Sequence, residues 1–266
     1  MEENQISKIR QTQIYLGKCF RIFFYEKSWK TFISALIITL LIASVTGSDM
    51  FTGYKDTQNG AFALVCACIW IGLFNSIQSI CKERDIIKRE YMSGLNIESY
   101  IIAHLIYEMA LCLVEALIVT FIVIITNFSN FPDSGVLLPA QIELYISFFL
   151  IIFASDALAI MISCIVKTTN TAMTIMPFVL IIQLVMSGMI FDLEGVASLV
   201  AKITISKWGL ALIGVTSDLN SMYSYSSDYE YAIYNLLLLW LILIVFVAAY
   251  TFIGIYFLKK VDKDKR

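Results

Sequence analysis

Three carboxylic acids, Glu108, Glu115 and Asp156, lie inside long apolar segments of the sequence. An ionised carboxylate at the centre of a transmembrane helix costs about 2.5–3.5 kcal/mol on insertion scales, so such groups face protein or water, or are protonated. Glu108 and Glu115 are seven residues apart, which places them on one face of a helix. We expect Glu108 to anchor its helix. For Glu115 and Asp156, a structural polar contact and a part in transport both stay open.

A second group of charges fills the stretch 81–100, CKERDIIKREYMSGLNIESY, between two apolar segments. The pattern predicts a short helix, a turn at Gly94 and re-entry into the next segment. A rigid hairpin of this kind can transmit force from a soluble partner to the spans that it joins, and an ordinary charged loop is the alternative. The charged residues that we expect to contact such a partner are Glu83, Arg84, Lys88, Arg89 and Glu90.

Neither the cysteines nor the histidine form a pattern typical of a metal site or a disulfide framework. The six cysteines are Cys19, Cys66, Cys68, Cys81, Cys112 and Cys164. By the span assignment below, they all lie in helices or on the cytoplasmic side, where disulfides are rare. His104 is the single histidine and has no second ligand nearby in the sequence. We therefore expect no bound metal and no catalytic residues.

The composition is that of an integral membrane protein. Hydrophobic residues make up 59% and charged residues 15% of the chain, and the mean hydropathy is +0.79. A soluble domain has about half apolar and about a quarter charged residues. The net charge of -2 gives no reason to expect a nucleic-acid partner. Polar and basic residues fill the beginning of the chain, so no signal peptide is evident.

Six segments are long and apolar enough to cross a bilayer core of about 30 Å. They are residues 29–45, 62–80, 100–126, 144–166, 171–191 and 234–258. All but three of the 19 Lys and Arg residues, the exceptions being Lys55, Lys202 and Lys207, then lie on one side of the membrane. This asymmetry predicts that both termini are cytoplasmic. A seventh span at 196–215 would place the basic C-terminal tail on the outer side of the membrane. We therefore interpret that stretch as an interfacial or re-entrant outer helix.

The predicted fold class is thus an all-α membrane protein with six transmembrane helices. Residues 1–28 alternate apolar and basic side chains with helical spacing and predict an amphipathic helix on the inner membrane surface. The flank of a signal anchor is the alternative interpretation. The predicted divisions are the connecting helix 1–28, the transmembrane domain 29–258 with a cytoplasmic helix at 82–95 and an outer loop at 192–233, and the basic tail 259–266.

Two stretches resemble the ABCG (White) kind of ABC exporter permease, a type-2 ABC transporter family. The coupling-helix region of that family is matched without a gap by Glu83, Arg84, Arg89, Glu90, Tyr91, Ser93, Gly94, Ser99 and Tyr100. Further on, Ser187-Gly188 precedes Met189-Ile190, and Ser206-Lys207-Trp208-Gly209 stands where the family has Pro-Arg-Tyr-Gly. The proline of that group is absent, as is a proline usual early in the third span.

The resemblance implies the transmembrane half of an ATP-driven exporter that works by alternating access. Two halves, identical or homologous, would surround a cavity in the lipid membrane, and Glu83–Gly94 would be the coupling helix that contacts an ATPase. Because the sequence has no G-x-x-x-x-G-K-[ST] phosphate loop, ATP and Mg would be bound by a separate subunit and no cofactor by this chain. The arrangement looks like the stand-alone permeases of bacterial plasma membranes.

The resemblance also assigns residues to the transport path of a hydrophobic or amphipathic substrate such as a lipid, peptide or drug. The cavity would be lined by Cys68, Ile71, Asn75, Gln78, Ile181, Leu184 and Val185, and Met189 and Ile190 would form an apolar outer plug. Hydrogen bonding between helices is the alternative role for Asn75 and Gln78, and helix packing is the alternative for the plug.

Two other classes of function remain as alternatives. A proton-coupled secondary transporter would use Glu108, Glu115 and Asp156, but it would show inverted repeats, and the unequal loops of the two halves show none. A purely structural membrane anchor would not need the polar face of the second span or the buried acids. An ATPase gene beside this one would favour the exporter.

Overall fold

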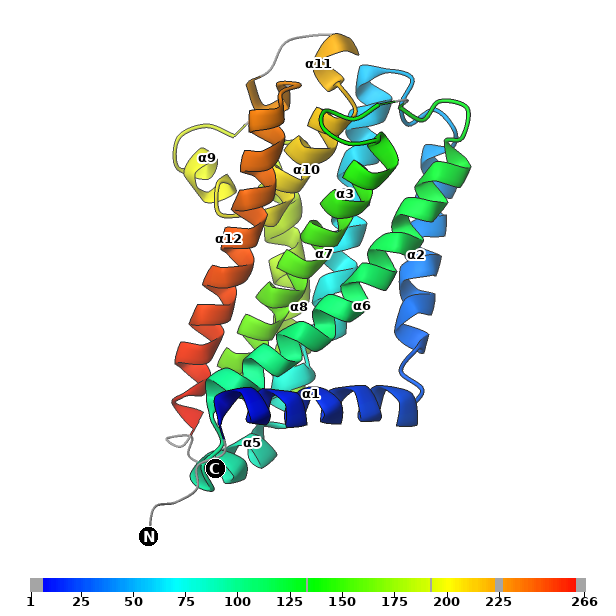
Figure 1. Ribbon diagram of the computed structural model, residues 1–266. Helices are drawn as coiled ribbons and strands as arrows, with labels where there is room; N and C mark the ends of the chain where they lie inside the picture. The colour runs from blue at the N-terminus through cyan, green and yellow to red at the C-terminus, as the bar shows by residue number, and fades with distance from the viewer. Residues whose placement is uncertain (1–6, 133, 192, 223–226, 262–266) are drawn as a thin grey trace.

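The protein is a bundle of long helices with one helix lying across its end (Figure 1). The computed structural model describes residues 7–132, 134–191, 193–222 and 227–261, and all regular structure within these ranges is helical. The elements are α1 (Lys8–Tyr25), α2 (Lys30–Thr46), α3 (Tyr54–Ser76), α4 (Ser79–Lys82), α5 (Arg84–Met92), α6 (Ile97–Thr126), α7 (Ala140–Ile165), α8 (Thr169–Val185), α9 (Val196–Ala201), α10 (Ile205–Thr216), α11 (Leu219–Met222), the 3-10 turn η1 (Ser227–Tyr229) and α12 (Ile233–Leu258).

Four stretches in the described part of the chain are long and apolar enough to cross a membrane. They are Tyr54–Lys82, Ile97–Thr126, Ala140–Ile165 and Ile233–Leu258. A fifth is obtained if α1 and α2, which are bent by 72° relative to each other, are counted together, and α8 and α10 are shorter apolar helices. The chain is therefore an all-α, multi-pass membrane protein. The count of six spans stays a prediction.

The boundaries of two predicted spans differ from the observed helices. The second span was predicted to begin at residue 62, but α3 begins at Tyr54. The first turns of α3 are polar, so hydropathy does not mark them as part of the span, although polar residues also form a helix. The fifth was predicted to reach residue 191, but α8 ends at Val185. Gly188 follows with a φ of 80°, a left-handed conformation that favours glycine and that does not continue a helix.

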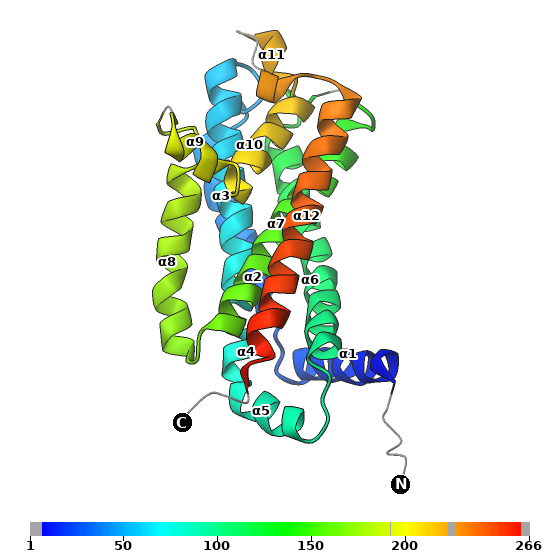
Figure 2. The ribbon, with the colours of Figure 1, turned by 90° about the vertical axis from the view of Figure 1, so that its left-hand side faces the viewer.

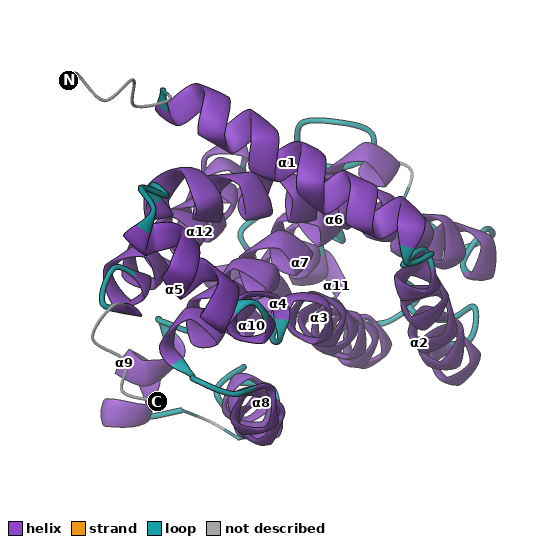
Figure 3. Cartoon of the chain, turned by 90° about the horizontal axis from the view of Figure 1, so that it is seen from below, coloured by secondary structure: helices purple, strands orange, loops and turns teal. Residues whose placement is uncertain are grey.

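α7 is the central helix of the bundle and packs against α3, α6, α10 and α12. Figure 3 shows it enclosed by these helices when the bundle is seen from below. Gly72 of α3 lies against the backbone of α7 so closely that a Cβ would collide with the carbonyl of Ile152. α12 buries one stripe, formed by Leu236, Leu239 and Leu243, and exposes apolar side chains on its other faces, as expected for a helix in contact with lipid.

The N-terminal helix predicted from residues 1–28 is present as α1. It packs against the start of α6 at the end of the bundle where α5 also lies (Figures 1 and 2). The hydroxyl of Ser7 accepts a hydrogen bond from the backbone N–H of Arg10 (3.4 Å) and so caps its beginning. The predicted N-terminal segment, outer loop and basic tail extend into residues 1–6, 192, 223–226 and 262–266, which lie outside the described ones.

The ambiguous stretch 196–215 forms two short helices, α9 and α10. Both lie at the end of the bundle opposite α1 and α5 (Figure 2). Ser206 joins α10 to α8, because its N–H donates to Oε1 of Gln183 (3.1 Å) and its hydroxyl donates to the carbonyl of the same residue (2.5 Å). With 6 and 12 residues, neither helix is long enough to span a bilayer core, as the re-entrant interpretation requires.

Candidate functional site

The candidate site is the elbow, residues 77–96, which joins α3 to α6. The chain leaves α3 at Ser76, forms the single turn of α4, and then the nine residues of α5. Gly94 has a φ of 101° and reverses the chain, and Asn96 caps α6 by accepting a hydrogen bond from the N–H of Ser99 (3.1 Å). The helix, turn and re-entry predicted from the sequence are therefore confirmed.

Two acids on the inner face of the elbow hold it against α1 and α6. Oε2 of Glu83 accepts from the ammonium of Lys18 (3.1 Å) and from the hydroxyl of Tyr100 (3.0 Å). Oε2 of Glu90 accepts from the hydroxyl of Tyr15 (2.9 Å). Burial and the neighbouring Glu90 raise the pKa of Tyr15 above its usual value, so the hydroxyl keeps the proton that it donates. These acids thus tie α5 to α1 and α6.

Arg84 ties the elbow to α7. Its Nη1 donates to the backbone carbonyls of Cys164 and Val166, both at 2.8 Å. These carbonyls lie at the end of α7, where four carbonyl groups lack partners within the helix. The hydroxyl of Ser163 accepts a further hydrogen bond from the N–H of Cys81 (3.0 Å). The elbow is therefore fixed to α1, α6 and α7 by polar contacts.

The outer face of the elbow is exposed. Ile86 is 40% and Met92 77% exposed, and Asp85 and Arg89 lie beside them. Sequence reasoning selected Arg89 but missed the other three, although their spacing of three and four residues indicates one helical face. Lys88 is half-buried. The face therefore combines both charges with exposed apolar side chains, as protein interfaces do.

An open groove of ≈ 540 Å³ runs between α1 and α5. Its lining includes Gln11, Ile14, Tyr15, Ile86, Arg89 and Gly94. Because Tyr15 and Glu90 are hydrogen-bonded at its wall, the groove is built by two elements whose spacing is fixed. A side chain of a partner protein can enter it beside the exposed face of α5.

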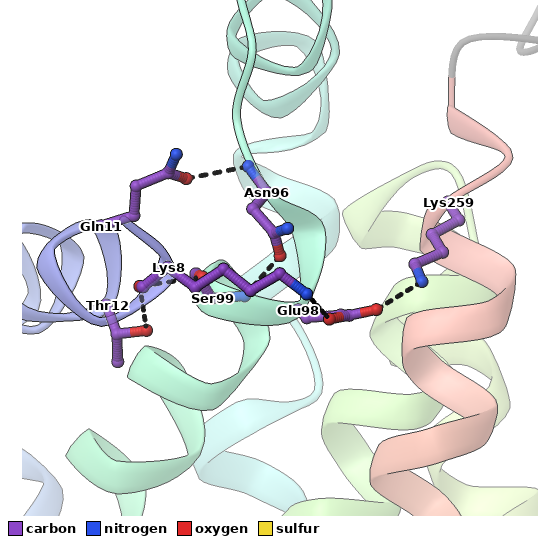
Figure 4. A network of polar contacts seen from close by, with 7 residues as sticks. All are labelled: Lys8, Gln11, Thr12, Asn96, Glu98, Ser99 and Lys259. Carbon is purple, nitrogen blue, oxygen red and sulfur yellow. Dashed lines mark hydrogen bonds and ion pairs between the residues drawn. The ribbon is translucent and has the colours of Figure 1, made fainter. Parts of the chain in front are cut away.

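Both ends of the described chain meet at the start of α6 (Figure 4). Glu98 accepts from the ammonium of Lys8 in α1 (2.9 Å) and from that of Lys259, just after α12 (2.6 Å). The hydroxyl of Ser99 donates to the carbonyl of Lys8 (3.0 Å). The N–H of Asn96 donates to Oε1 of Gln11 (2.9 Å). We call the pairing of Lys8, Glu98 and Lys259 the clasp. It places α1 and α12 beside the elbow.

Comparison with known proteins identifies the family. The sequence matches the ABC-2 type transporter family over residues 10–213, a range that includes the elbow. The chain belongs to this family. It is similar to the ABC transporter ATP-binding/permease protein Rv1747 of Mycobacterium tuberculosis, with 26% identity over 225 residues, which cover 80% of this chain and 26% of that protein. The chain thus spans about a quarter of the length of this relative. It is an ABC transporter membrane subunit.

The structure does not gather the cavity residues predicted on α3 of this ABC-2 permease into one open face. Cys68 and Ile71 are 0% and 1% exposed and pack inside the chain's own core. Asn75 is half-buried and donates a hydrogen bond to Oε1 of Glu115 on α6 (2.7 Å). Gln78 is half-buried in the break between α3 and α4. For Asn75, the contact found is therefore the alternative one, a hydrogen bond between helices.

The predicted residues on α8 and after it lie nearer the surface of the permease. Ile181 is 55% exposed, whereas Leu184 and Val185 are half-buried. Of the predicted plug, Met189 is half-buried and Ile190 is exposed. On α3, the large side chains that do reach the surface are Trp70 and Phe74, one turn apart. Hydropathy could not find them, since residues 61–74 of α3 are apolar on all sides.

A fully buried acid that sequence reasoning missed lies at the far end of the bundle. Glu143, at the start of α7, accepts hydrogen bonds from the N–H groups of Leu137 (3.1 Å) and Leu138 (3.4 Å) and from the hydroxyl of Thr216 (2.7 Å). It joins the α6–α7 loop to α10. The residue lies one position before the predicted span 144–166.

The cysteines and the histidine do not form a metal site in the described part of the chain. No group of three or more His, Cys, Asp or Glu side chains there could hold a metal ion. All six cysteines are free thiols. Sγ of Cys19 lies 3.9 Å from Nε2 of His104 at the contact between α1 and α6. Burial, followed by the neighbouring Glu83, raises the pKa of the Cys19 thiol to about 11, so this thiol is protonated at neutral pH.

Proposed function

We propose that the chain is the permease subunit of an ATP-driven exporter and that the exposed face of α5 receives force from a separate ATPase subunit. The observation that carries the proposal is the two-sided construction of the elbow. Glu83, Arg84 and Glu90 fasten its inner face to α1, α6 and α7. Ile86 and Arg89 point away from the chain on its outer face. A force applied outside is thus passed to three helices.

This assignment divides the predicted coupling residues into two groups with different roles. Arg89, with Asp85, Ile86 and Met92, forms the contact with the ATPase, and the groove between α1 and α5 accepts a side chain of that partner. Glu83 and Arg84 do not contact the partner but keep α5 in place, and Glu90 fixes the wall of the groove through its hydrogen bond with Tyr15. Gly94 permits the turn that returns the chain to the membrane.

ATP and Mg are bound by the partner subunit in this proposal. The sequence contains no G-x-x-x-x-G-K-[ST] phosphate loop, and family membership supports an ATPase partner. The mycobacterial relative, whose name joins an ATP-binding part to a permease, supports the same pairing of parts. The alternative of a proton-coupled carrier would leave the exposed face of α5 without a role.

Six spans result when α2 and α8 are counted as complete crossings. Each has 17 residues, which at 1.5 Å per residue is about 26 Å and close to the thickness of a bilayer core. In this arrangement the termini and the elbow lie in the cytoplasm, on the side with most Lys and Arg, and the membrane is the plasma membrane. α9 and α10 are then the re-entrant outer segment.

A hydrophobic or amphipathic substrate, such as a lipid, peptide or drug, would pass between this chain and a second permease half, identical or homologous. The exposed apolar residues Trp70, Phe74 and Ile181 support such a path, and we replace Cys68 and Ile71 by the first two as lining residues. Met189 and Ile190 form the apolar plug at the outer end. Alternating access then follows when ATP draws the two ATPase subunits together and displaces both elbows.

Copurification of the tagged full-length chain from its native membrane tests the proposal. We expect an ATPase subunit with a phosphate loop to copurify, and to be lost in the variants Ile86→Asp and Arg89→Glu. The control is Lys55→Glu, a reversal at an exposed residue at the other end of the bundle, which should keep the ATPase. An ATPase that copurifies equally with all variants would contradict the assignment of the α5 face, and the absence of any ATPase from the wild-type sample would contradict the function.

A further inference from the structure

The three acids noted from the sequence lie inside the bundle on α6 and α7, close to the last residues of α3. Glu108 and Glu115 come from α6 and are 5% and 0% exposed, and Asp156 comes from α7 and is 0% exposed. Asn75 donates to Oε1 of Glu115 at 2.7 Å. The hydroxyl of Ser76 donates to Oδ1 of Asp156, and Glu108 lies close to the same hydroxyl.

Within the part of the chain that the structure describes, no positive charge compensates these acids. Among the described residues, no Lys or Arg forms an ion pair with any of the three. The other titratable side chains close to them, from α1, α3 and α6, are Cys19, Cys68, Tyr107 and Cys112. Thiols and phenols carry no positive charge in either protonation state. The hydrogen bonds that the described residues give these acids therefore come from a neutral amide and a neutral hydroxyl.

Three neighbouring carboxylates cannot all be ionised in such surroundings. A buried charge without a partner is strongly unfavourable, and like charges that share a site disfavour one another's ionisation. Oδ2 of Asp156 and Oε2 of Glu115 are buried and have no hydrogen-bond partner among the described residues. A bound proton removes the charge at such an oxygen.

The hydroxyl of Ser76 shows how one proton can be shared. It has a single hydrogen to donate, and it has two carboxyl neighbours, Asp156 and Glu108. Whichever acid does not receive that hydrogen can bond to the Ser76 oxygen only by donating a proton of its own. The geometry is therefore satisfied when one of the two acids is protonated and the other is not.

We propose that Glu108, Glu115 and Asp156 form a proton-binding site inside the membrane, in which Ser76 links Asp156 to Glu108. Ser76 is the last residue of α3, directly before the elbow. A displacement of the elbow changes the position of the hydroxyl relative to Asp156, so proton binding is linked to the position of the elbow. The existence of the site does not depend on the ATP-driven function proposed above.

Infrared difference spectroscopy of the purified full-length chain in lipid nanodiscs tests the site directly. The C=O stretch of a protonated carboxyl differs from the stretches of a carboxylate. At neutral pH we expect a protonated-carboxyl band in the wild type that loses intensity in Asp156→Asn and in Glu108→Gln. The matched control is Glu98→Gln, which removes a carboxylate paired with two lysines and should leave the band unchanged. A wild-type spectrum without the band would overturn the proposal.

A chemical label gives a second readout that does not need a folded variant. A hydrophobic carbodiimide reacts with protonated carboxyls in apolar surroundings, where the acid adds across a C=N bond and the mass rises by that of the whole reagent. We expect peptide mapping to find the adduct on at least one of Glu108, Glu115 and Asp156 at neutral pH, with less adduct as the pH is raised. No adduct on any of the three, or labelling that depends on sodium or potassium instead of pH, would show that the site does not hold a proton.

Discussion

Tyr15 of α1 donates a 2.9 Å hydrogen bond to Glu90 of α5, and this contact joins the helix across the end of the bundle to the exposed elbow. The rings of Tyr15 and Tyr100 also pack edge to face, with their centroids 5.3 Å apart, and Tyr100 in turn donates to Glu83. Two aromatic residues and two acids therefore set the distance between α1, α5 and α6. A displacement of α5 relative to α1 would therefore break the contact between Tyr15 and Glu90.

Tyr15→Phe should destabilise the chain, because it leaves Glu90 without its donor while keeping the ring in place. A hydrogen bond to a partly exposed acid contributes on the order of 1 kcal/mol to the free energy of unfolding. Denaturant unfolding in micelles measures this loss. Tyr25→Phe is the matched control, since Tyr25 is 90% exposed, and it should change stability by less than about 0.5 kcal/mol. Equal effects in the two variants would show that the contact with Glu90 contributes nothing.

Arg84→Met should destabilise the chain more than Arg89→Met. The first variant removes the donor for the carbonyls of Cys164 and Val166, and leaving buried groups unpaired costs roughly 1–3 kcal/mol. The second variant alters an exposed side chain of the same length. We expect Arg89→Met to retain stability and to lose ATPase binding, and Arg84→Met to lower the unfolding midpoint. The reverse order would contradict the division of the elbow into an anchored and a docking face.

The sequence was sufficient to predict the elbow because its signals are local. A polar run between two apolar segments, a glycine after a short helix and an asparagine before the next one each act within a few residues. The seven-residue spacing of Glu108 and Glu115 likewise placed both acids on one face of α6. These features required no knowledge of which helices are neighbours.

The contacts of the elbow could not be predicted because they depend on distant parts of the chain. Arg84 was assigned to an ATPase contact, but its partners lie 80 and 82 residues away at the end of α7. The open face of α3 was misplaced for a related reason. Cys68 and Trp70 are both compatible with an apolar helix, and only the packing of α7 against Gly72 decides which side is buried. Hydropathy carries no such information for residues 61–74, which are apolar on all sides of the helix.

Gly94→Ala and Gly17→Ala should have opposite effects on stability. Gly94 has a φ of 101°, which an L side chain rarely adopts, so a Cβ there introduces strain of roughly 1–3 kcal/mol. Gly17 lies inside α1 with open space around a Cβ, so alanine there should stabilise the helix by up to about 1 kcal/mol. Denaturant unfolding of both variants decides the matter. A neutral Gly94→Ala would mean that the turn does not need glycine.

Glu98→Gln should loosen both partners of the clasp. The variant removes the charge that pairs with Lys8 and Lys259 while it keeps the shape of the side chain. We expect faster amide hydrogen exchange in the first turns of α1 and in the last turns of α12, and the same change in the wild type at high salt, which screens exposed ion pairs. Glu26→Gln, at an exposed residue just after α1, is the control. If exchange is unchanged in both helices, the clasp does not hold the ends together.

Cys19 should react slowly with alkylating reagents at neutral pH, and faster as the pH rises. The thiolate is the nucleophile, and burial together with Glu83 raises the pKa of Cys19 from 9.0 to about 11. The thiolate fraction at neutral pH is then about a hundredfold lower than that of an ordinary thiol, and it grows tenfold with each pH unit until the pH approaches the pKa.

Glu83→Gln should speed this reaction, because removal of the nearby negative charge lowers the pKa of the thiol. The rate is measured by mass spectrometry of the alkylated Cys19 peptide across a pH series. Ser93→Cys supplies the control, since Ser93 is exposed on the elbow and a cysteine there should follow the pH dependence of a free thiol. If Cys19 reacts as fast as that control at neutral pH, then α1 does not rest against the elbow as the structure shows, and the anchoring role of Glu83 fails with it.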